Sequence, residues 1–587
     1  MSLLVALVIA VDACGIDSGA GRDLTTWDTR SDFSTARLHG TTATSDGSVA
    51  LKGTPISTVP RPNAGMGPLR RLRSNPRYFT ADGVTAVYLT GSHTWENLVD
   101  GSATDPPAAF DYGAYLANLK RWNHNFIRLW AWDVTFDSNR GDLRFYSPQP
   151  FVRSGPGKAL DGKPKFDLSR LNQAYFDRLR SRLLQARSAG IYVSIMLFEG
   201  YTPTKGPLPA AYQGHPFTAE NNINGIDGDL NDDGRLNEVY TLPGQGGLRD
   251  INEIQEAYVR KVIDSVNDLD NVLYEIANEA PDATTAWQYE LIDYIKDYEA
   301  GKPKQHPVGM TFQWADGENA TLFESPADWV SPRNRIDDPP AANGAKVIVS
   351  DTDHHCGICA EANGDWAWRE FASGRNPIFM DAYEDQRGGA STGPGDSARM
   401  AMGETRRVAD RINLAAMTPH RKLASTGYVL ADPGHEYLVY QPARGPFTLN
   451  LVRQVGKTFN VNWIAVASGS KRTETISGGD DVTLTTPFDA AAAAYVRAND
   501  RYRAAGSLVI THDAGKPRRW TKLTLKATIP ASTRISVETR SSNDRARWSP
   551  WRRAAAALPR GRYVQIRVHL STTDASRTPI LDKVTLQ

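Results

Sequence analysis

The residues of this chain that could do acid–base chemistry lie where apolar runs end. The stretch NVLYEIANEA, residues 271–280, carries a buried-looking run that stops on Asn278 and Glu279. A second run, NPIFMDAYED at 376–385, carries Asp381 at the corresponding point. Cleavage of a glycosidic bond needs two carboxyl groups: one donates a proton to the leaving oxygen, and the other attacks the anomeric carbon or activates water. The sequence therefore predicts Glu279 as the proton donor and Asp381 as the nucleophile of such a reaction.

Further polar and aromatic side chains end the same apolar runs and form a candidate substrate-binding set. Aromatic rings suit sugars because sugar C–H faces stack on them, and amides, carboxylates and imidazoles hydrogen-bond hydroxyl groups. We expect Asn278 to hold the hydroxyl next to the reacting carbon, and His354 to contact substrate or to orient Asp381. The full set is His93, Trp95, Trp130, Trp132, Glu199, Asn278, Trp314, Asp353, His354 and Tyr383.

Both catalytic assignments have alternatives. Glu279 could instead belong to a helix cap near Asp282, and Asp381 could tie a strand end to a neighbouring loop. As an acid, Glu279 needs a raised pKa, which partial burial beside a second carboxylate would provide. Three other carboxylates compete with Asp381 for the role of nucleophile, namely Asp353, Glu384 and Glu199.

Apolar runs alternate with amphipathic stretches through the middle of the chain. Helices are predicted at 112–122, 175–190, 251–266 and 286–298, where apolar residues recur at helical spacing. Continuous apolar strands separated by helices indicate a parallel sheet that is covered on both faces. The eight predicted strands are 85–93, 125–133, 191–200, 271–280, 306–314, 345–354, 376–385 and 412–417.

Eight such units predict an α/β fold built on a (β/α)8 TIM barrel. The competing doubly wound open sheet is disfavoured, because no glycine-rich phosphate loop follows the first strand. In a (β/α)8 barrel the reactive residues stand at the C-terminal ends of the strands. The fourth and seventh strands face each other across the mouth, and in the predicted order they end on Glu279 and Asp381.

Two small antiparallel β-sandwich domains are predicted after the barrel, because short alternating strands replace the helices. The lead-in before the barrel is rich in Ser, Thr, Gly and Asp and has little periodicity. The predicted division is an export segment at 1–20, a linker or lead-in at 21–74, the barrel at 75–424, a β-sandwich at 425–503 and an accessory β-sandwich at 504–587.

Charge and hydropathy argue against several classes of partner. The net charge is +1 and no dense basic stripe occurs, so we expect no nucleic acid. The apolar stretch from Leu3 to Val11 is too short to cross a bilayer and resembles the core of a signal peptide. We expect a secreted monomer without a transmembrane segment, or a bacterial cell-surface lipoprotein anchored through Cys14.

The segment DLNDDGRLNE, residues 229–238, has the spacing of the first half of a calcium loop. Oxygen-bearing side chains at the first, third and fifth positions precede a glycine that allows a sharp turn. The twelfth position is Tyr240, so a carboxylate must come from elsewhere. The expected ligand set is Asp229, Asn231, Asp233, Arg235 and Glu238. The alternative is an empty turn rich in Asp and Asn. Calcium would be structural, and no cofactor is expected to take part in the chemistry.

The segment DHHCGIC, residues 353–359, also has the residue types of a metal cluster. The preferred interpretation is a local disulfide between Cys356 and Cys359, because such pairs oxidise in exported proteins; zinc is the alternative. Only three cysteines occur, so the chain is not a disulfide scaffold.

Several motifs, taken together, resemble the apiosidase-like glycoside hydrolases. They are RYFTADGVTAVYLTGSHTWENLVDG (77–101), IMLFEGY (195–201), HPFTAENNINGIDGD (215–229), NVLYEIANEA (271–280), VIVSDTDHHCGI (347–358) and NPIFMDAYED (376–385). The resemblance covers about 75–500. It implies a (β/α)8 barrel related to a large retaining clan, with Glu279 as acid/base. The chain departs from the clan at Asp381, where Glu is usual.

The two C-terminal domains carry resemblances of their own. Residues 436–469 resemble a small β-sandwich of collagen-binding type that follows such barrels, and the last domain resembles accessory sandwiches of secreted carbohydrate-active proteins. The collagen label is inherited by similarity and does not by itself imply collagen binding.

We therefore expect a secreted glycoside hydrolase that cleaves O-glycosidic bonds in a plant or microbial polysaccharide or oligosaccharide, with retention of configuration. One alternative is a non-catalytic carbohydrate- or matrix-binding protein on a barrel scaffold. Another is a metal-dependent hydrolase that uses Asp351, Asp353, His354 and His355. The fold does not fix the sugar, the linkage or the choice between endo and exo action.

Overall fold

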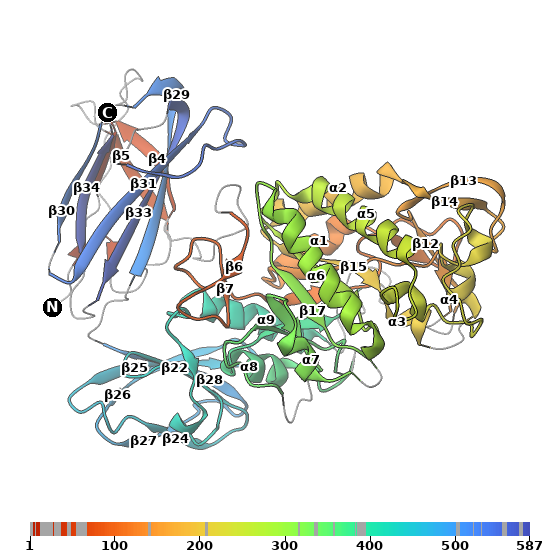
Figure 1. Ribbon diagram of the computed structural model, residues 1–587. Coiled ribbons are helices and arrows are strands. Elements are labelled where there is room, and N and C mark those ends of the chain that lie inside the picture. Colours follow the sequence, from red (N-terminus) through yellow and green to blue (C-terminus); the bar gives the residue numbers. More distant parts are fainter. Residues whose placement is uncertain are drawn as a thin grey trace.

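The computed structural model describes residues 67–138, 142–205, 209–314, 317–333, 339–355, 359–381, 383, 395–499, 505–520, 522–529, 531–554, 560–573 and 579–586. It also describes the backbone of five short strands before residue 55: β1 (Leu4–Val5), β2 (Val8–Val11), β3 (Trp27–Asp28), β4 (Arg37–Ala43) and β5 (Val49–Thr54). Figure 1 shows a helix-covered barrel and two β domains, the first of which shares a buried core with helices of the barrel.

Eight parallel strands form the barrel, which confirms the predicted fold class. The two edge strands meet where the backbone N–H of Asn125 donates to the carbonyl of Thr90 at 3.0 Å. A Cβ on Gly91 would lie 2.0 Å from the Phe126 carbonyl oxygen, so only glycine allows this approach. The sheet order is β10 (Phe126–Leu129), β15 (Tyr192–Glu199), β16 (Val272–Asn278), β17 (Val308–Thr311), β18 (Trp329–Ser331), β19 (Val347–Asp351), β20 (Asn376–Met380) and β8 (Gly91–His93).

The order of the barrel strands differs from the predicted order, and this changes the candidate site. The predicted eighth strand at 412–417 was wrong, because these residues form no strand. The prediction also missed β18, whose three residues are too few for a recognisable pattern. Trp329 of β18 is fully buried against Gly309 of β17, where a Cβ would lie 1.9 Å from the ring. Hence β19 is the seventh barrel strand and β20 the eighth.

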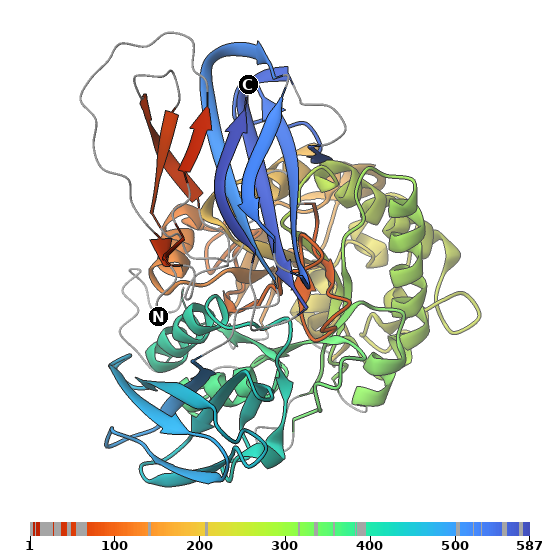
Figure 2. The ribbon, with the colours of Figure 1, turned by 90° about the vertical axis from the view of Figure 1, so that its left-hand side faces the viewer.

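Amphipathic helices cover the outside of the barrel (Figures 1 and 2). The helix α2 begins after Asn172, whose side chain accepts from the Ala174 N–H at 3.3 Å, and ends at Gly190 with φ +80°. None of the described helices combines the length and the apolar character needed to cross a membrane. The helices between or after the barrel strands are α1 (Tyr112–Arg121), α2 (Gln173–Ala189), α5 (Arg249–Val266), α6 (Thr285–Ala300), α8 (Gly364–Ala372) and α9 (Asp396–Ala409), with the short α7 (Asn319–Glu324).

Short elements build the loops around the mouth of the barrel. The three-stranded sheet joins β9 (Asp100–Ser102), β11 (Phe136–Asp137) and β12 (Arg144–Ser147), and a hairpin joins β13 (Phe151–Lys158) to β14 (Pro164–Leu171). The short helices of these loops are α3 (Tyr201–Thr204), α4 (Pro209–Gly214), η1 (Ala219–Asn221), η2 (Asn237–Tyr240) and η3 (Asp282–Thr284). Away from the mouth, β6 (Arg70–Arg71) pairs with β7 (Phe79–Thr80), which packs against the N-terminal ends of the barrel strands, and η4 (Arg421–Leu423) lies in the β domain that follows the barrel.

An antiparallel β domain follows the barrel, as predicted. Its larger sheet has the order β21 (Thr418–Pro419), β22 (Val429–Asp432), β23 (Glu436–Gln441), β28 (Ala492–Ala498), β25 (Thr458–Ala465) and β26 (Lys471–Ser477). A second sheet pairs β24 (Pro446–Asn450) with β27 (Asp481–Thr485). Buried apolar residues from both sheets, including Phe447 and Trp463, share one core.

The last β domain contains strands from both ends of the chain (Figures 1 and 2). β4 and β5 fall within the range that we expected to be a lead-in, and β4 pairs in parallel with β29. β2 pairs in parallel with β34. The C-terminal strands are β29 (Ala505–Arg519), β30 (Leu523–Thr528), β31 (Thr533–Ser542), β32 (Arg552–Arg553), β33 (Arg560–Thr572) and β34 (Ile580–Leu586).

Candidate functional site

The fourth barrel strand, β16, delivers Glu279 to the mouth of the barrel. Every residue of this strand is buried, and Glu279 follows it with φ +44°, in the left-handed region that non-glycine residues rarely adopt. The adjacent β15 ends in register, with Glu199 opposite Asn278. A Cβ on Gly200 would lie 2.4 Å from the Ala280 Cβ, so the two strand ends are in close contact. This packing holds the backbone that directs the half-buried side chain of Glu279.

A buried arginine that the sequence analysis overlooked organises the base of the site. Arg128 lies in β10, and its side chain is 1% exposed. Its Nε donates to Glu275 Oε2 at 3.0 Å and its Nη2 to Asn278 Oδ1 at 2.9 Å. Its Nη1 donates to Asp351 Oδ2 and Asp353 Oδ2, both at 3.1 Å. The sequence did contain a signal, namely one arginine inside the apolar run FIRLW. An arginine in a buried strand is almost always paired, so this position predicts acidic partners nearby. Arg128 therefore links the ends of the second, fourth and seventh strands.

The seventh strand, β19, ends on three ionisable side chains. One potential ligand atom from each of Asp351, Asp353 and His354 lies within 4.8 Å of the others. Asp351 is fully buried and is 3.0 Å from His93 Nε2. Although burial acts in the opposite direction, His93 and Arg128 hold the pKa of Asp351 below its ordinary value. Burial, followed by the charge of Asp351, raises the pKa of Asp353 to about 6.

This cluster suits a divalent metal ion poorly. Arg128 donates to both Asp351 and Asp353, so a guanidinium already supplies the positive charge at their oxygens. His354 Nδ1 lies 2.8 Å from the Ser331 hydroxyl, and burial lowers the pKa of His354 to about 3. The guanidinium therefore disfavours a metal ion at these two carboxylates, and His354 Nδ1 contacts Ser331 rather than Asp381.

Glu279 and Asp353 are electrostatic neighbours across the mouth. Burial raises the pKa of Glu279 well above its ordinary value, the charge of Asp353 raises it further, and Arg128 opposes both effects. The side chain of Asp353 remains 13% exposed. Burial and the charge of Asp353 thus favour the protonated form of Glu279, whereas Arg128 favours the ionised form of Asp353. The fourth and seventh strands therefore present two interacting carboxyl groups in different environments.

Asp381, predicted as the nucleophile, lies in a different environment. It follows β20, the eighth strand, and is fully buried. Arg399 Nε donates to Asp381 Oδ2 at 2.8 Å, and Arg399 Nη2 binds the other carboxylate oxygen. The Asp381 N–H donates to the His93 carbonyl at 2.8 Å. This environment corrects the prediction, because a nucleophile needs an accessible oxygen. The competing candidate Glu384 lies outside the described residues.

The predicted aromatic platforms divide into core and surface residues. Trp130 and Trp132 are 2% and 5% exposed; Trp130 stacks on the fully buried His93, and Trp132 stacks on Tyr146 with ring centroids 4.2 Å apart. These three predicted substrate contacts are therefore part of the core. Trp95, Trp314 and Tyr383 are half-buried and can still meet a ligand, and Trp314 packs edge-on against Tyr201.

Glu199 belongs to a buried acidic pair with Asp133. Glu199 is 1% exposed, and its backbone N–H donates to Asp133 Oδ2 at 3.1 Å. The Tyr240 hydroxyl donates to the same oxygen at 2.9 Å. Burial raises the pKa of Asp133 to about 7, and burial together with the Asp133 charge raises that of Glu199 to about 8. Glu199 Oε1 also lies 3.5 Å from the amide nitrogen of Asn278, which is 3% exposed. Glu199 and Asn278, both predicted to contact substrate, are therefore buried next to the strand end that carries Glu279.

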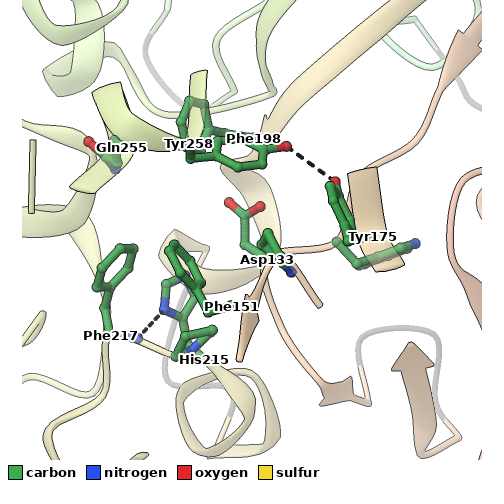
Figure 3. A pocket seen from close by; sticks show the side chains of 11 residues that line it. Asp133, Phe151, Tyr175, Phe198, His215, Phe217, Gln255 and Tyr258 are labelled. Carbon is green, nitrogen blue, oxygen red and sulfur yellow. Dashed lines mark hydrogen bonds between the residues drawn. The ribbon is translucent and has the colours of Figure 1, made fainter. Parts of the chain in front are cut away.

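A small cavity lies behind this acidic pair (Figure 3). Asp133 projects between Tyr258 and His215, and the cavity of about 30 Å³ is otherwise mostly aromatic. The hydroxyls of Tyr175 and Tyr258 lie 3.2 Å apart on one side. Burial lowers the pKa of His215 to about 3, so this histidine is neutral and gives Asp133 no counter-charge.

Cys359, the second residue of the predicted cysteine pair, is disulfide-bonded. Its predicted partner Cys356 lies outside the described residues, as does Cys14.

Comparisons with known proteins place the barrel in a broad structural class. The model of a domain of unknown function, DUF6298, matches residues 139–323, which include Glu199 and Glu279. No curated protein matches the chain. A "putative glycoside hydrolase" from Bacteroides vulgatus ATCC 8482 is similar in structure, with TM-score 0.50 and 14% identity over 78% of this chain and 86% of that one.

Two further solved structures are similar at lower scores. A glycoside hydrolase family 5 protein from Bacteroides vulgatus ATCC 8482 has TM-score 0.48 and 12% identity over 74% of this chain and 94% of that one. A family 5 mannosidase from Rhizomucor miehei has TM-score 0.36 and 13% identity over 60% and 99%. At 14% identity the match with TM-score 0.50 speaks for the fold alone, and the apiosidase-like and collagen-binding resemblances stay predictions.

Proposed function

We propose that this protein hydrolyses O-glycosidic bonds in a polysaccharide or oligosaccharide, with Glu279 as the general acid and Asp353 as the second carboxylate. The observation that carries the proposal is that Glu279 and Asp353 follow the fourth and seventh barrel strands and interact electrostatically, while Arg128 hydrogen-bonds only Asp353 of the two. Two titratable groups whose environments drive their pKa values apart supply an acid and a base in one site. We assign the role of second carboxylate to Asp353 instead of Asp381, because Asp353 follows β19, which is the seventh strand, whereas Asp381 follows β20.

The geometry supports a division of labour among the residues. Protonated Glu279 donates its proton to the leaving glycosidic oxygen while ionised Asp353 attacks the anomeric carbon or activates a water molecule. If Asp353 attacks, Glu279 then removes a proton from the water that hydrolyses the glycosyl-enzyme. Arg128 favours the ionised form of Asp353, and its bond to Asn278 fixes the residue that precedes Glu279.

The proposal extends to the substrate and the compartment. Trp95, Trp314 and Tyr383 would stack on sugar rings of a plant or microbial glycan, since they are the half-buried members of the predicted set. The disulfide at Cys359 supports action outside the cytoplasm, where such bonds persist. The secreted monomer, and the lipid anchor at Cys14 as its alternative, are part of this proposal.

A panel of plant and bacterial polysaccharides tests the proposed activity. The purified full chain should release reducing sugar from at least one of them, and Glu279→Gln should lose nearly all of this release. Glu290→Gln is the matched control, because Glu290 is exposed on α6. Equal release by Glu279→Gln in a folded protein would overturn the assignment of the acid. Binding of one glycan without release by the wild type would favour the carbohydrate-binding alternative.

A further inference from the structure

Asp351, the last residue of β19, is a buried carboxylate to which the proposed reaction gives no role. It is 1% exposed, and its Oδ1 lies 3.0 Å from His93 Nε2. The same oxygen accepts the backbone N–H of Asp353 at 3.0 Å, and Oδ2 accepts from Arg128 Nη1 at 3.1 Å. Asp351 therefore binds the backbone of the second carboxylate directly.

Arg128 joins the side chains of Asp351 and Asp353. Its Nη1 donates to Asp351 Oδ2 and to Asp353 Oδ2, both at 3.1 Å. Hydrogen bonds between ionised partners are roughly twice as strong as those between neutral ones. Because the Asp353 N–H is bound to Asp351 as well, both the backbone and one carboxylate oxygen of Asp353 are fixed.

The second carboxylate oxygen of Asp353 stays available. Among the described residues, the hydrogen bonds of Asp353 use its backbone N–H and its Oδ2, and its side chain remains 13% exposed. A reacting carboxylate needs one oxygen that is free to approach the anomeric carbon or a water molecule. Oδ1 is therefore the oxygen that the contacts with Asp351 and Arg128 leave for the substrate.

Trp130 supports the partners of Asp351 from the core. The fully buried His93 stacks on it with ring centroids 5.7 Å apart and planes inclined by 10°. The Arg128 guanidinium lies 5.0 Å from the centroid of the same ring. Packing of this kind restricts the rotamers of the residues that hold a reactive group.

We propose that Asp351 is a positioning residue for Asp353, which it holds through the backbone and through Arg128 so that Asp353 Oδ1 faces the substrate. The proposal rests on the proposed hydrolase function, in which Asp353 is the second carboxylate. Asp351 is buried under these contacts and does not touch the substrate itself. Alignment of a reacting oxygen affects kcat more than substrate binding, so the role is visible in kinetics.

Asp351 also influences the ionisation of Asp353. After burial, the charge of Asp351 is the main influence that raises the pKa of Asp353, and Arg128 and His93 lower it. The charged and titratable groups around Asp353 are His93 of β8, Arg128 of β10, Glu279 after β16, and Asp351 and His354 at the end of β19. Loss of the Asp351 charge should therefore shift the ionisation of Asp353 to lower pH.

Kinetics of Asp351→Asn across the pH range test the proposal on the glycan that the wild type hydrolyses. We expect kcat to fall roughly ten- to a hundredfold while KM changes less than about threefold. The acid limb of kcat/KM should move to lower pH by roughly one unit.

Glu299→Gln is the matched control. Glu299 is also 1% exposed and also lies beside a buried histidine, with 2.8 Å between its Oε1 and His306 Nδ1. It lies near the end of α6, before β17 begins, and thus at the opposite end of the barrel strands from Asp353. This variant should lose melting temperature but keep the acid limb of the wild type.

Carbodiimide labelling of Asp353 in the full chain gives a readout that needs no substrate. Carbodiimides activate protonated carboxyl groups, so labelling at Asp353, located by peptide mass spectrometry, should fall as the pH rises through a midpoint of about 6. The midpoint should be lower in Asp351→Asn. If that variant does not fold, His93→Gln replaces it: this change removes a charge that lowers the pKa of Asp353, so the midpoint should rise.

Three results would overturn the proposal. The first is a folded Asp351→Asn protein with the labelling midpoint and kcat of the wild type. The second is an equal shift of the acid limb in Glu299→Gln, which would mark a general effect of lost stability. The third, where Asp351→Asn does not fold, is an unchanged midpoint in His93→Gln. A wild type that releases no sugar but shows the labelling shifts would contradict the hydrolase function and still support the contact between Asp351 and Asp353, so the two failures are distinguishable.

Discussion

Asp353, at the end of the seventh barrel strand, raises the pKa of Glu279, at the end of the fourth. The effect favours the protonated form of Glu279, which is the form a general acid needs. Arg128 hydrogen-bonds Asp353 at 3.1 Å, and its charge opposes the rise in the pKa of both carboxyl groups. The pKa values of Glu279 and Asp353 therefore depend on Arg128, a buried residue with no direct part in the proposed reaction.

The first prediction concerns the pH dependence of hydrolysis. Activity requires ionised Asp353, so kcat/KM should rise through an apparent pKa near about 6. It also requires protonated Glu279, so kcat/KM should fall only on the alkaline side, above the raised pKa of that group. Initial rates across the pH range check both limbs. An enzyme that is most active below about pH 4 would contradict the assignment of Asp353.

The second prediction separates Asp381 from the chemistry. Asp381→Asn removes the buried partner of Arg399 and leaves only the partly exposed Asp396 paired with it, so the free energy of unfolding should fall by about 3 kcal/mol. Asp396→Asn is the control, because Asp396 also pairs with Arg399 but is 35% exposed. Urea unfolding measures both variants. A fully stable Asp381→Asn protein that has lost its activity would return Asp381 to the catalytic site.

The third prediction concerns stability and pH at Glu199. Its folded pKa of about 8 exceeds its ordinary value, so the folded state holds a proton that the unfolded state releases. This contribution to stability is present below the unfolded pKa and is lost as the pH rises through about 8. Glu199→Gln should therefore lose less stability than the wild type between about pH 5 and pH 9. Urea midpoints at the two pH values provide the comparison, with Glu290→Gln as control; parallel losses in all three proteins would refute the interpretation.

The fourth prediction distinguishes a sugar platform from the core. Trp314→Ala should raise KM roughly three- to tenfold with little change in melting temperature, since stacking on an aromatic ring contributes about 0.5–1.5 kcal/mol. Trp132→Ala should instead lower the free energy of unfolding by about 3 kcal/mol, because Trp132 is buried against Tyr146. Steady-state kinetics and thermal melts on both variants test the distinction. A destabilised Trp314→Ala protein beside a stable Trp132→Ala protein with raised KM would contradict both assignments.

The sequence predicted the fold class, and it offered Asp353 only as an alternative to Asp381. Glu279 could be singled out as the candidate acid because β16 is continuously apolar and is followed by a polar pair. β18 was not predicted because three residues are too few to show a periodic pattern. Without it, the strand that precedes Asp381 was counted as the seventh instead of the eighth. Trp130, Trp132 and His93 were predicted to contact substrate because the sequence does not reveal which side chains near a strand end are buried in the core. Arg128 escaped because its partners, Glu275, Asp351 and Asp353, are more than 140 residues away in the chain.

The most direct test of the central claim is kcat of Asp353→Asn, measured on the glycan that the wild type hydrolyses, beside its melting temperature. The account predicts a loss of about 10³-fold or more in kcat, because one of the two required carboxylates is absent, while the protein stays folded. Partial recovery with added azide would identify Asp353 as the nucleophile, since a small anion can attack in its place. A folded Asp353→Asn protein with nearly wild-type kcat would contradict the account.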